Sequence, residues 1–179
     1  MNAAQRAMTT WVGALSSSGV LEPDDGDAEA GGAVAAYVVG EDRVEELRAF
    51  FRDAAPAEIA RERRAAVEAV IGMAQSDRDV HPEERHLLSR LVARSGLDED
   101  TQDELVMRVH EPQEITDLGE RLTHPVLREL MLALAWELAL ADGRIDEAET
   151  TFYRSLAEQL GVEPERAEEI AGSVAGRLA

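Results

Sequence analysis

Apolar side chains recur every three or four residues along most of this chain of 179 residues, which is the spacing of one face of an α-helix. Few runs are rich in the β-branched residues that strands favour. The pattern therefore predicts an all-α fold. We expect helices over residues 1–16, 42–53, 56–76, 82–96, 98–109, 125–141, 146–160 and 164–179, with a short helix near Ile115, Leu118 and Leu122.

The segment before residue 56 has a less regular pattern. The apolar side chains that share one face of its first helix are Ala4, Met8, Trp11, Val12 and Leu15. Residues 17–32 are acidic and contain glycine, so we expect a linker or a mobile loop. Residues 33–39 fit either a helical turn or a short extended piece. The first helix is then either a detachable segment that binds a partner or a helix folded onto the core.

Residues 126–141 are apolar on nearly every face of a helix, interrupted only by Arg128, Glu129 and Glu137. A helix with this pattern lies in the centre of a bundle, because neighbours must cover it on all sides. We expect it to form the core of a helical domain over residues 56–179. Residues 1–55 would then supply an N-terminal helix, an acidic loop and a lead-in helix.

An internal repeat relates two parts of this domain. Asp77 and Asp142 are 65 positions apart (142 − 77), and the same offset relates six further pairs. These are Ala74 and Ala139, Val80 and Ile145, Glu84 and Glu149, Leu91 and Leu156, Gly96 and Gly161, and Leu97 and Val162. The agreement predicts a duplicated helix–acidic turn–helix unit, whose two copies bury their apolar stripes against each other.

Much of the repeat has a structural explanation. Asp146 followed by Glu149 is the pattern of a helix N-cap with an acidic third residue. In the first copy His81 takes the cap position and Glu84 the third position. The glycine shared by both copies fits a helix end that requires a left-handed backbone.

The aspartates of the repeat are harder to explain in this way. Asp77 and Asp142 lie near helix C-termini, where the helix dipole disfavours an anion by roughly 0.3–1 kcal/mol. A residue placed against its local preference is a candidate for function. Clustered carboxylates beside free carbonyl groups suit a hard, calcium-like divalent cation, although the spacing is not that of an EF-hand loop. The candidate ligands are Asp142, Asp146, Glu149, Asp77 and Glu84. In the alternative, these residues only cap helices and hold turns.

The charge of the chain limits its partners. A formal net charge of -19 repels phosphate backbones and anionic membrane surfaces, so we expect no binding to nucleic acid. The same charge favours cations or basic protein partners. The chain contains no cysteine, which excludes disulfides and thiolate chemistry. No apolar stretch is long enough to span a membrane, and we expect a cytoplasmic protein without membrane insertion.

The two copies read AQSDRDVHPEERHLLSRLVARSGL over residues 74–97 and ALADGRIDEAETTFYRSLAEQLGV over residues 139–162. Together they resemble the tellurite-resistance TerB family and its TerB-like relatives, in which an A-D-G-x-[IV]-x-x-x-E turn occurs twice between helices. The resemblance covers about residues 56–178. The first copy departs from the signature, because Ser76-Asp77-Arg78 replaces Ala-Asp-Gly. The resemblance implies a non-enzymatic helical domain associated with divalent metals and stress-response assemblies, with ligands at the five candidate positions.

Specific metal centres and catalytic motifs have less support in the sequence. Glu83 and His86 form an E-x-x-H pair, but a di-iron site needs a second such pair, and the other copy has no histidine there. His81, His86 and Asp77 are a weaker set of zinc ligands. No phosphate loop, metalloprotease motif or nucleophile elbow occurs. We therefore predict a protein that is not an enzyme. It is either a divalent-cation-binding stress-response or interaction module, or a metal-free acidic adaptor or scaffold subunit that binds a protein partner.

Overall fold

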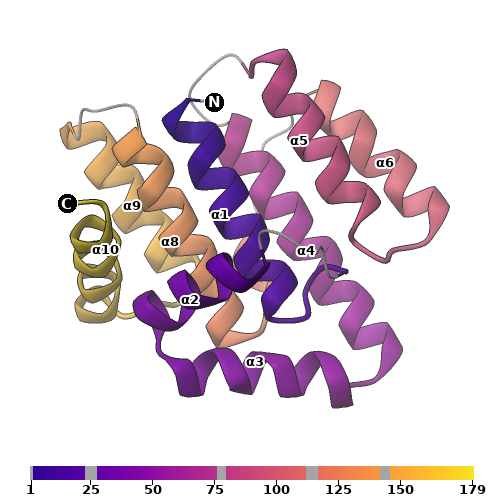
Figure 1. The fold of residues 1–179 in the computed structure, drawn as a ribbon, viewed down its shortest axis with the longest axis horizontal. Coiled ribbons are helices and arrows are strands. Elements are labelled where there is room, and N and C mark those ends of the chain that lie inside the picture. The colour runs from indigo at the N-terminus through magenta and orange to yellow at the C-terminus, as the bar shows by residue number, and fades with distance from the viewer. Residues whose placement is uncertain (1, 23–27, 76–79, 112–116, 142–145) are drawn as a thin grey trace.

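The computed structural model describes residues 2–22, 28–75, 80–111, 117–141 and 146–179. Within these ranges the regular elements are helices and no strand occurs, so the predicted all-α fold is confirmed. The helices are α1 (Ala3–Ser17), α2 (Ala28–Val39), α3 (Glu41–Asp53), α4 (Pro56–Gln75), α5 (Pro82–Ala93), α6 (Glu99–His110), α7 (Leu118–Arg121), α8 (Pro125–Ala141), α9 (Glu147–Gln159) and α10 (Pro164–Leu178). Figure 1 shows α5 and α6 on one side of the bundle, α9 and α10 on the other, and α3 along one end.

Helix α8 forms the centre of the bundle, as its apolar sequence predicts. It contacts α1, α2, α3, α4, α9 and α10. Its side chains that are at most 1% exposed are Val126, Leu127, Leu130, Met131, Leu132, Ala133 and Leu134. Full burial of one large aliphatic side chain contributes about 1.5–3 kcal/mol. Helix α8 therefore supplies a large part of the apolar stabilisation.

Helix α2 begins inside the segment predicted to be a loop. The loop prediction is wrong for residues 28–32, which belong to α2, and residues 33–39 continue the same helix. The glycines there serve close packing, because a Cβ on Gly31 would lie 2.2 Å from the backbone nitrogen of Ala14. Glycine therefore lets α2 approach the backbone of α1. The same residue type is common in linkers, which explains the wrong prediction.

Helix α1 is folded onto the core. Its side chains Met8, Trp11 and Leu15 are between 1% and 2% exposed. The indole Nε1 of Trp11 donates a hydrogen bond of 2.6 Å to Oε2 of Glu137 in α8. Of the two alternatives for this helix, the detachable segment is wrong, because its apolar stripe is already covered by α2 and α8.

Two pairs of helices keep the offset of the sequence repeat. Helices α5 and α9 begin at Pro82 and Glu147, and α6 and α10 at Glu99 and Pro164, so both pairs differ by 65 (147 − 82 and 164 − 99). The helix ends before α6 and α10 contain glycines with φ of +68° and +67°, so the predicted left-handed positions are confirmed. The duplication itself stays a prediction. We call α4–α6 the first unit and α8–α10 the second unit.

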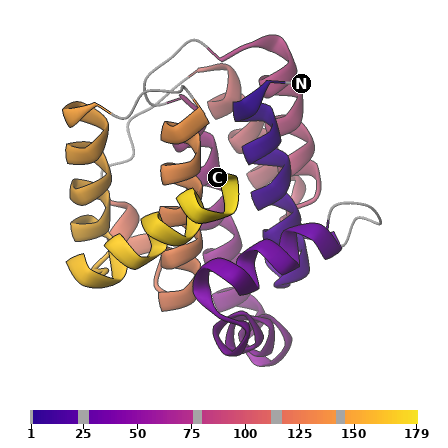
Figure 2. The same cartoon turned by 60° about the vertical axis from the view of Figure 1, so that its left-hand side comes forward.

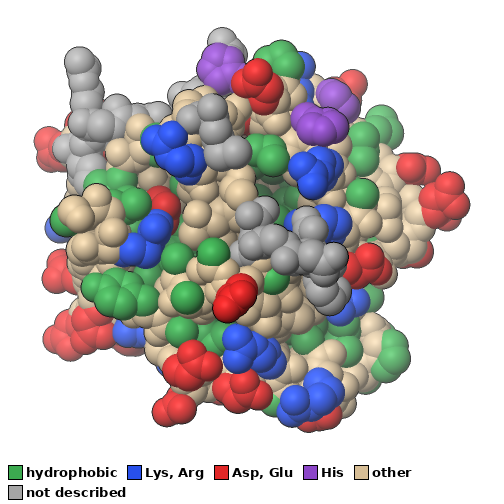
Figure 3. Space-filling view, in the orientation of Figure 1, with side chains coloured by type: hydrophobic (Ala, Val, Ile, Leu, Met, Phe, Trp, Pro, Cys, Tyr) green, Lys and Arg blue, Asp and Glu red, His purple; other side chains and the backbone are tan. Residues whose placement is uncertain are grey.

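Three smaller expectations concern the short helix near Leu118, membrane-spanning helices and the charge of the surface. The short helix predicted near Leu118 is α7, whereas Ile115 lies outside the described residues. None of the described helices is long and apolar enough to cross a membrane. On the face drawn in Figure 3, acidic and basic side chains are mixed, as expected for solvated helices that pair charges of both signs.

Candidate functional site

The predicted cation ligands belong to two separate turns, at the starts of α5 and α9. Asp77 and Asp142 lie outside the described residues. Asp146 is the N-cap of α9, and its Oδ1 accepts a hydrogen bond of 2.9 Å from the backbone N–H of Glu149, which confirms its capping role. In the part of the chain that the structure describes, no three histidine, aspartate or glutamate side chains gather closely enough to hold a metal ion.

Glu84 and Glu149 occupy the same position in the two units, the third residue of a helix. Glu84 is fully buried, and its helix α5 has His81 as N-cap, as predicted. Glu149 is partly buried, and its Oε2 is enclosed without a hydrogen bond from any described residue. An enclosed carboxylate oxygen without a donor is costly, and a bound cation would offset that cost. Oxygen donors of this kind fit a hard cation, but the described residues supply only part of such a site.

An apolar groove that the sequence did not predict lies between α9 and α10. Its volume is about 650 Å³, which is in the usual range of binding pockets. The apolar part of its lining consists of Trp136 from α8, Tyr153 and Ala157 from α9, and Val162, Pro164, Ala167 and Ala171 from the turn and α10. Figure 2 shows that α10, after the turn that follows α9, runs away from α9 and across α8.

Two aromatic rings form the floor of the groove. The ring centroids of Trp136 and Tyr153 are 4.7 Å apart, with an angle of 52° between their planes. The hydroxyl of Tyr153 donates a hydrogen bond of 2.5 Å to the backbone oxygen of Ala167, which ties α9 to α10. Burial raises the pKa of Tyr153 above its usual value, because the phenolate would lose its hydration. The phenol is therefore a neutral structural donor near neutral pH.

The rim of the groove is acidic. Glu158, Glu163 and Glu168 line it and are exposed, and Arg154 is the only basic residue among the described residues of the lining. Exposed carboxylates around an apolar floor raise the local concentration of cationic ligands and disfavour anionic ones. The groove therefore offers apolar contact and a negative edge at the same place.

Buried ion pairs fix the direction of α10 and thereby the shape of the groove. Nε of Arg166 donates a hydrogen bond of 2.6 Å to Oε1 of Glu129, a residue of α8 that is 5% exposed. This hydrogen bond raises the pKa of Arg166. Arg43 of α3 donates to the other oxygen of Glu129 at 2.8 Å. At the far end of α10, Arg177 pairs with Glu137 of α8. These contacts hold α10 across α8.

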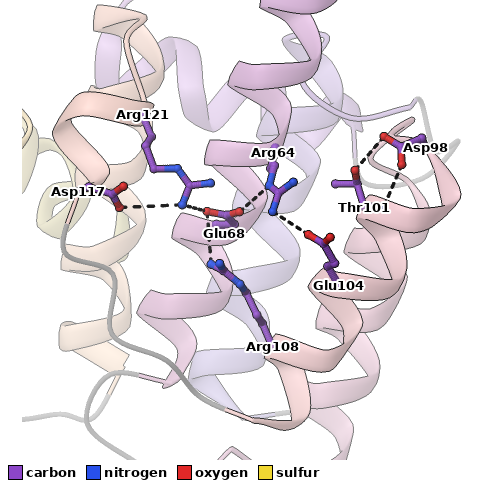
Figure 4. A network of polar contacts seen from close by, with 8 residues as sticks. All are labelled: Arg64, Glu68, Asp98, Thr101, Glu104, Arg108, Asp117 and Arg121. Carbon is purple, nitrogen blue, oxygen red and sulfur yellow. Dashed lines mark hydrogen bonds and ion pairs between the residues drawn. The ribbon is translucent and has the colours of Figure 1, made fainter.

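The first unit carries a different network, drawn in Figure 4. Glu68 of α4 is 2% exposed and pairs with Arg64 at 2.9 Å, with Arg108 of α6 at 3.4 Å, and with Arg121 of α7. Arg64 also reaches Glu104 of α6 at 2.9 Å. Its hydrogen bond to Glu68 raises the pKa of Arg64. This network holds α6 and α7 against α4.

A family model described as a protein of unknown function, DUF533, matches residues 2–174. The chain belongs to the DUF533 family. The match begins in front of α1, so it includes the N-terminal helices as well as the two units. No curated protein and no solved structure matches this DUF533 chain.

The groove of this DUF533 chain had a signal in the sequence. Two of its small residues, Ala157 and Ala171, lie 65 positions after Val92 and Val106 of the first unit (157 − 92 and 171 − 106). Comparison of the two copies by side-chain size, in addition to residue identity, would have indicated missing volume in the second unit. The direction of α10 had no such local signal.

Proposed function

We propose that this DUF533 protein is a non-enzymatic, TerB-like interaction module that binds a protein partner in the groove between α9 and α10. The observation that carries the proposal is the groove, with its apolar floor and its exposed carboxylates. Protein-binding sites typically combine an apolar centre with a polar rim. The repeated acidic turn and the family match over residues 2–174 support the TerB-like assignment. The resemblance adds a cytoplasmic stress or tellurite response as the biological setting.

The chemistry of the groove also favours binding over catalysis. Its one buried titratable side chain, Tyr153, already donates to the carbonyl of Ala167. Its raised pKa makes the phenol a poor acid or base near neutral pH. The exposed glutamates of the rim are suited to attracting a ligand.

Site-specific photo-crosslinking in the producing cells tests the proposal. A benzophenone side chain at Glu168 lies at the groove, and the same group at Asp103, 65 positions earlier on the exposed face of α6, is the matched control. We expect a discrete protein adduct from position 168 and none of the same mass from position 103. Identical adducts from both positions, or no adduct from position 168, would contradict the proposal.

A divalent cation at the acidic turns is a second candidate function, favoured by the enclosed Oε2 of Glu149. Asp142, Asp146 and Glu149 would hold an ion in the second unit, and Asp77 and Glu84 would belong to the first. A calcium-like ion suits these ligands, because all of them are oxygens. Such an ion would stiffen the turn between α8 and α9 without entering the groove.

Thermal denaturation of metal-stripped protein with calcium, magnesium or zinc tests the cation proposal. An ion that binds the folded protein adds about 2.7 kcal/mol at a hundredfold excess over its dissociation constant. We expect one ion to raise the melting temperature selectively, and Asp142→Asn to abolish the shift. Asp98→Asn is the control, because Asp98 caps α6 outside the repeated turns and its loss should leave the ion response intact. Absence of any shift at millimolar ion concentrations would refute this candidate.

A further inference from the structure

We infer that the occupant of the groove between α9 and α10 is a basic amphipathic helix of another protein. The inference rests on the proposed function and specifies the chemistry of the partner. Its basis is the combination of small residues and aromatic rings inside the groove with carboxylates along the edge.

The shape of the groove suits a helix. The lining residues run from Thr150 to Glu158 on α9 and from Pro164 to Ala171 on α10, so the walls are about 12 Å long at a rise of 1.5 Å per residue. Ala157, Ala167 and Ala171 leave room at the walls, and the tilted rings of Trp136 and Tyr153 provide an apolar floor. A helix that presents large apolar side chains at i, i+3 or i+4, and i+7 would fill such a groove along one stripe.

The charges around the groove select a basic helix. Glu158, Glu163 and Glu168 are exposed at the rim, where lysine or arginine residues beside the apolar stripe of a bound helix would meet them. The net charge of -19 extends this attraction beyond the groove. An acidic helix would be repelled by both, and so would the anionic head group of a fatty acid or phospholipid.

A second copy of this chain is a poorer occupant. Each copy carries the same net charge of -19, so two copies repel each other at moderate ionic strength. The helix of this chain whose apolar stripe could have filled the groove of another copy is α1. That stripe is already buried, with Trp11 at 1% exposure. The occupant is therefore expected to come from a different protein.

Fluorescence anisotropy with the full-length protein and a synthetic peptide tests the inference. The probe is a labelled amphipathic Leu/Lys peptide that spans roughly 20 Å as a helix, about 13 residues. The same peptide with glutamate in place of lysine, and a scrambled Leu/Lys peptide that lacks an apolar stripe, are the ligand controls. We expect micromolar binding of the first peptide, weakened by salt, together with a change in Trp136 fluorescence.

Three variants test whether the peptide binds in the groove. The triple variant E158Q/E163Q/E168Q should weaken binding by about tenfold, because it removes three charges that face the peptide. The triple variant E99Q/D100N/D103N makes the same change in net charge on α6 and should change the affinity less than about threefold. Ala171→Phe should abolish binding by filling the groove. Circular dichroism checks whether the Ala171→Phe protein folds. If it does not fold, the comparison of the two triple variants still tests the inference.

Equal weakening by the two triple variants would overturn the inference, because binding would then follow net charge alone. Full affinity of a folded Ala171→Phe protein would overturn it too. So would preferred binding of the glutamate peptide, the scrambled peptide or oleate, and so would a dimer in sedimentation that Ala171→Phe abolishes. If the Leu/Lys peptide fails to bind while the crosslinker at Glu168 still captures a protein, only the basic-helix inference falls. If both experiments fail, the proposed function falls as well.

Discussion

The two units place their third helix differently. In the first unit α6 lies against α4 and α5, and the buried carboxylate of Glu68 holds it there. In the second unit α10 crosses α8 (Figure 2). Ion pairs of Arg166 with Glu129 and of Arg177 with Glu137 tie the two helices together. The same order of helices, with the same glycine turn, therefore leads to two different packings. Charged side chains that lie apart in the sequence decide between them.

Charge placement explains the difference in detail. The positions that match Glu129 and Arg166 in the first unit are Arg64 and Thr101 (129 − 65 and 166 − 65). The ion pair between Glu129 and Arg166 therefore has no counterpart at these two positions. Instead Arg64 turns to Glu68 and Glu104.

Side-chain size sharpens the comparison. Val92 of the first unit is 1% exposed, and Val106 packs against the core. At the matched positions of the second unit, Ala157 and Ala171 also pack in or against the core, but their shorter side chains line the groove between α9 and α10. A helix pair becomes a binding groove when two such side chains are shortened and the third helix is anchored elsewhere.

The largest effect is expected for Glu68→Ala, which removes the carboxylate at the centre of the first network. Arg64, Arg108 and Arg121 would lose their shared partner, and loss of one member of a buried ion pair costs roughly 3–5 kcal/mol. The three arginines are partly exposed, so we expect the lower end of that range in urea unfolding. Glu104→Ala is the control and should cost less than about 1 kcal/mol, because that carboxylate is exposed. Equal costs would mean that burial of Glu68 does not stabilise the first unit.

A reciprocal change of side-chain size comes next. Val92→Ala should lower the free energy of unfolding by about 1.5–3 kcal/mol, since it removes two buried carbons and leaves a cavity. Ala171→Val, which gives the second unit the residue of the first, should cost less than about 1 kcal/mol, because the groove has room. Both are measured by urea unfolding. If Ala171→Val destabilises the protein as much as Val92→Ala, the groove is filled in solution.

A third change removes the hydrogen bond between α9 and α10. Tyr153→Phe should cost about 1 kcal/mol near neutral pH. The folded pKa of Tyr153 lies above the usual 10.0, so its contribution is complete below pH 10.0 and is lost as the pH rises further and the unfolded chain ionises. The difference between the two proteins in urea unfolding should therefore shrink above pH 10.0. The first unit has Leu88 at this position, which does not titrate. A constant difference across this pH range would contradict the burial of the phenol.

The smallest expected effect is on the stability of the protein at acidic pH. Nδ1 of His124 accepts a hydrogen bond of 3.2 Å from the backbone N–H of Val126 at the start of α8, and burial lowers the pKa of His124. The folded pKa lies below the usual 6.5, so this contribution is complete above pH 6.5 and is lost as the pH falls through the folded pKa. His124→Asn keeps a side chain that can accept the hydrogen bond from Val126 but does not titrate. We therefore expect the free energy of unfolding of this variant to fall less below pH 6.5 than that of the unchanged protein. The matched residue of the first unit is Ile59, so Ile59→Ala should leave the acid dependence unchanged. An unaltered pH profile in His124→Asn would show that His124 does not contribute.

Several elements of the fold were predictable because their causes are local. The helices, the cap at Asp146, the glycine helix ends and the central α8 follow from residues a few positions apart. The loop prediction for residues 28–32 was wrong, because glycine is typical of linkers and also of close helix contacts such as Gly31 with Ala14. Of the candidate site, the capping role of Asp146 was predictable, and the small side chains of Ala157 and Ala171 were a signal of missing volume, whereas the direction of α10 was not predictable.

The sequence by itself determined where most of the helices begin and end and which helix is central. Hydrogen bonding within one helical turn and the spacing of apolar residues decide these features. Only the tertiary structure decided that α1 is locked onto the core and that α10 leaves α9. Those outcomes depend on pairs such as Trp11 with Glu137 and Arg166 with Glu129, which are 126 and 37 positions apart. A buried carboxylate is stable only when partners from other helices meet it, and which partners meet is a property of the whole packing.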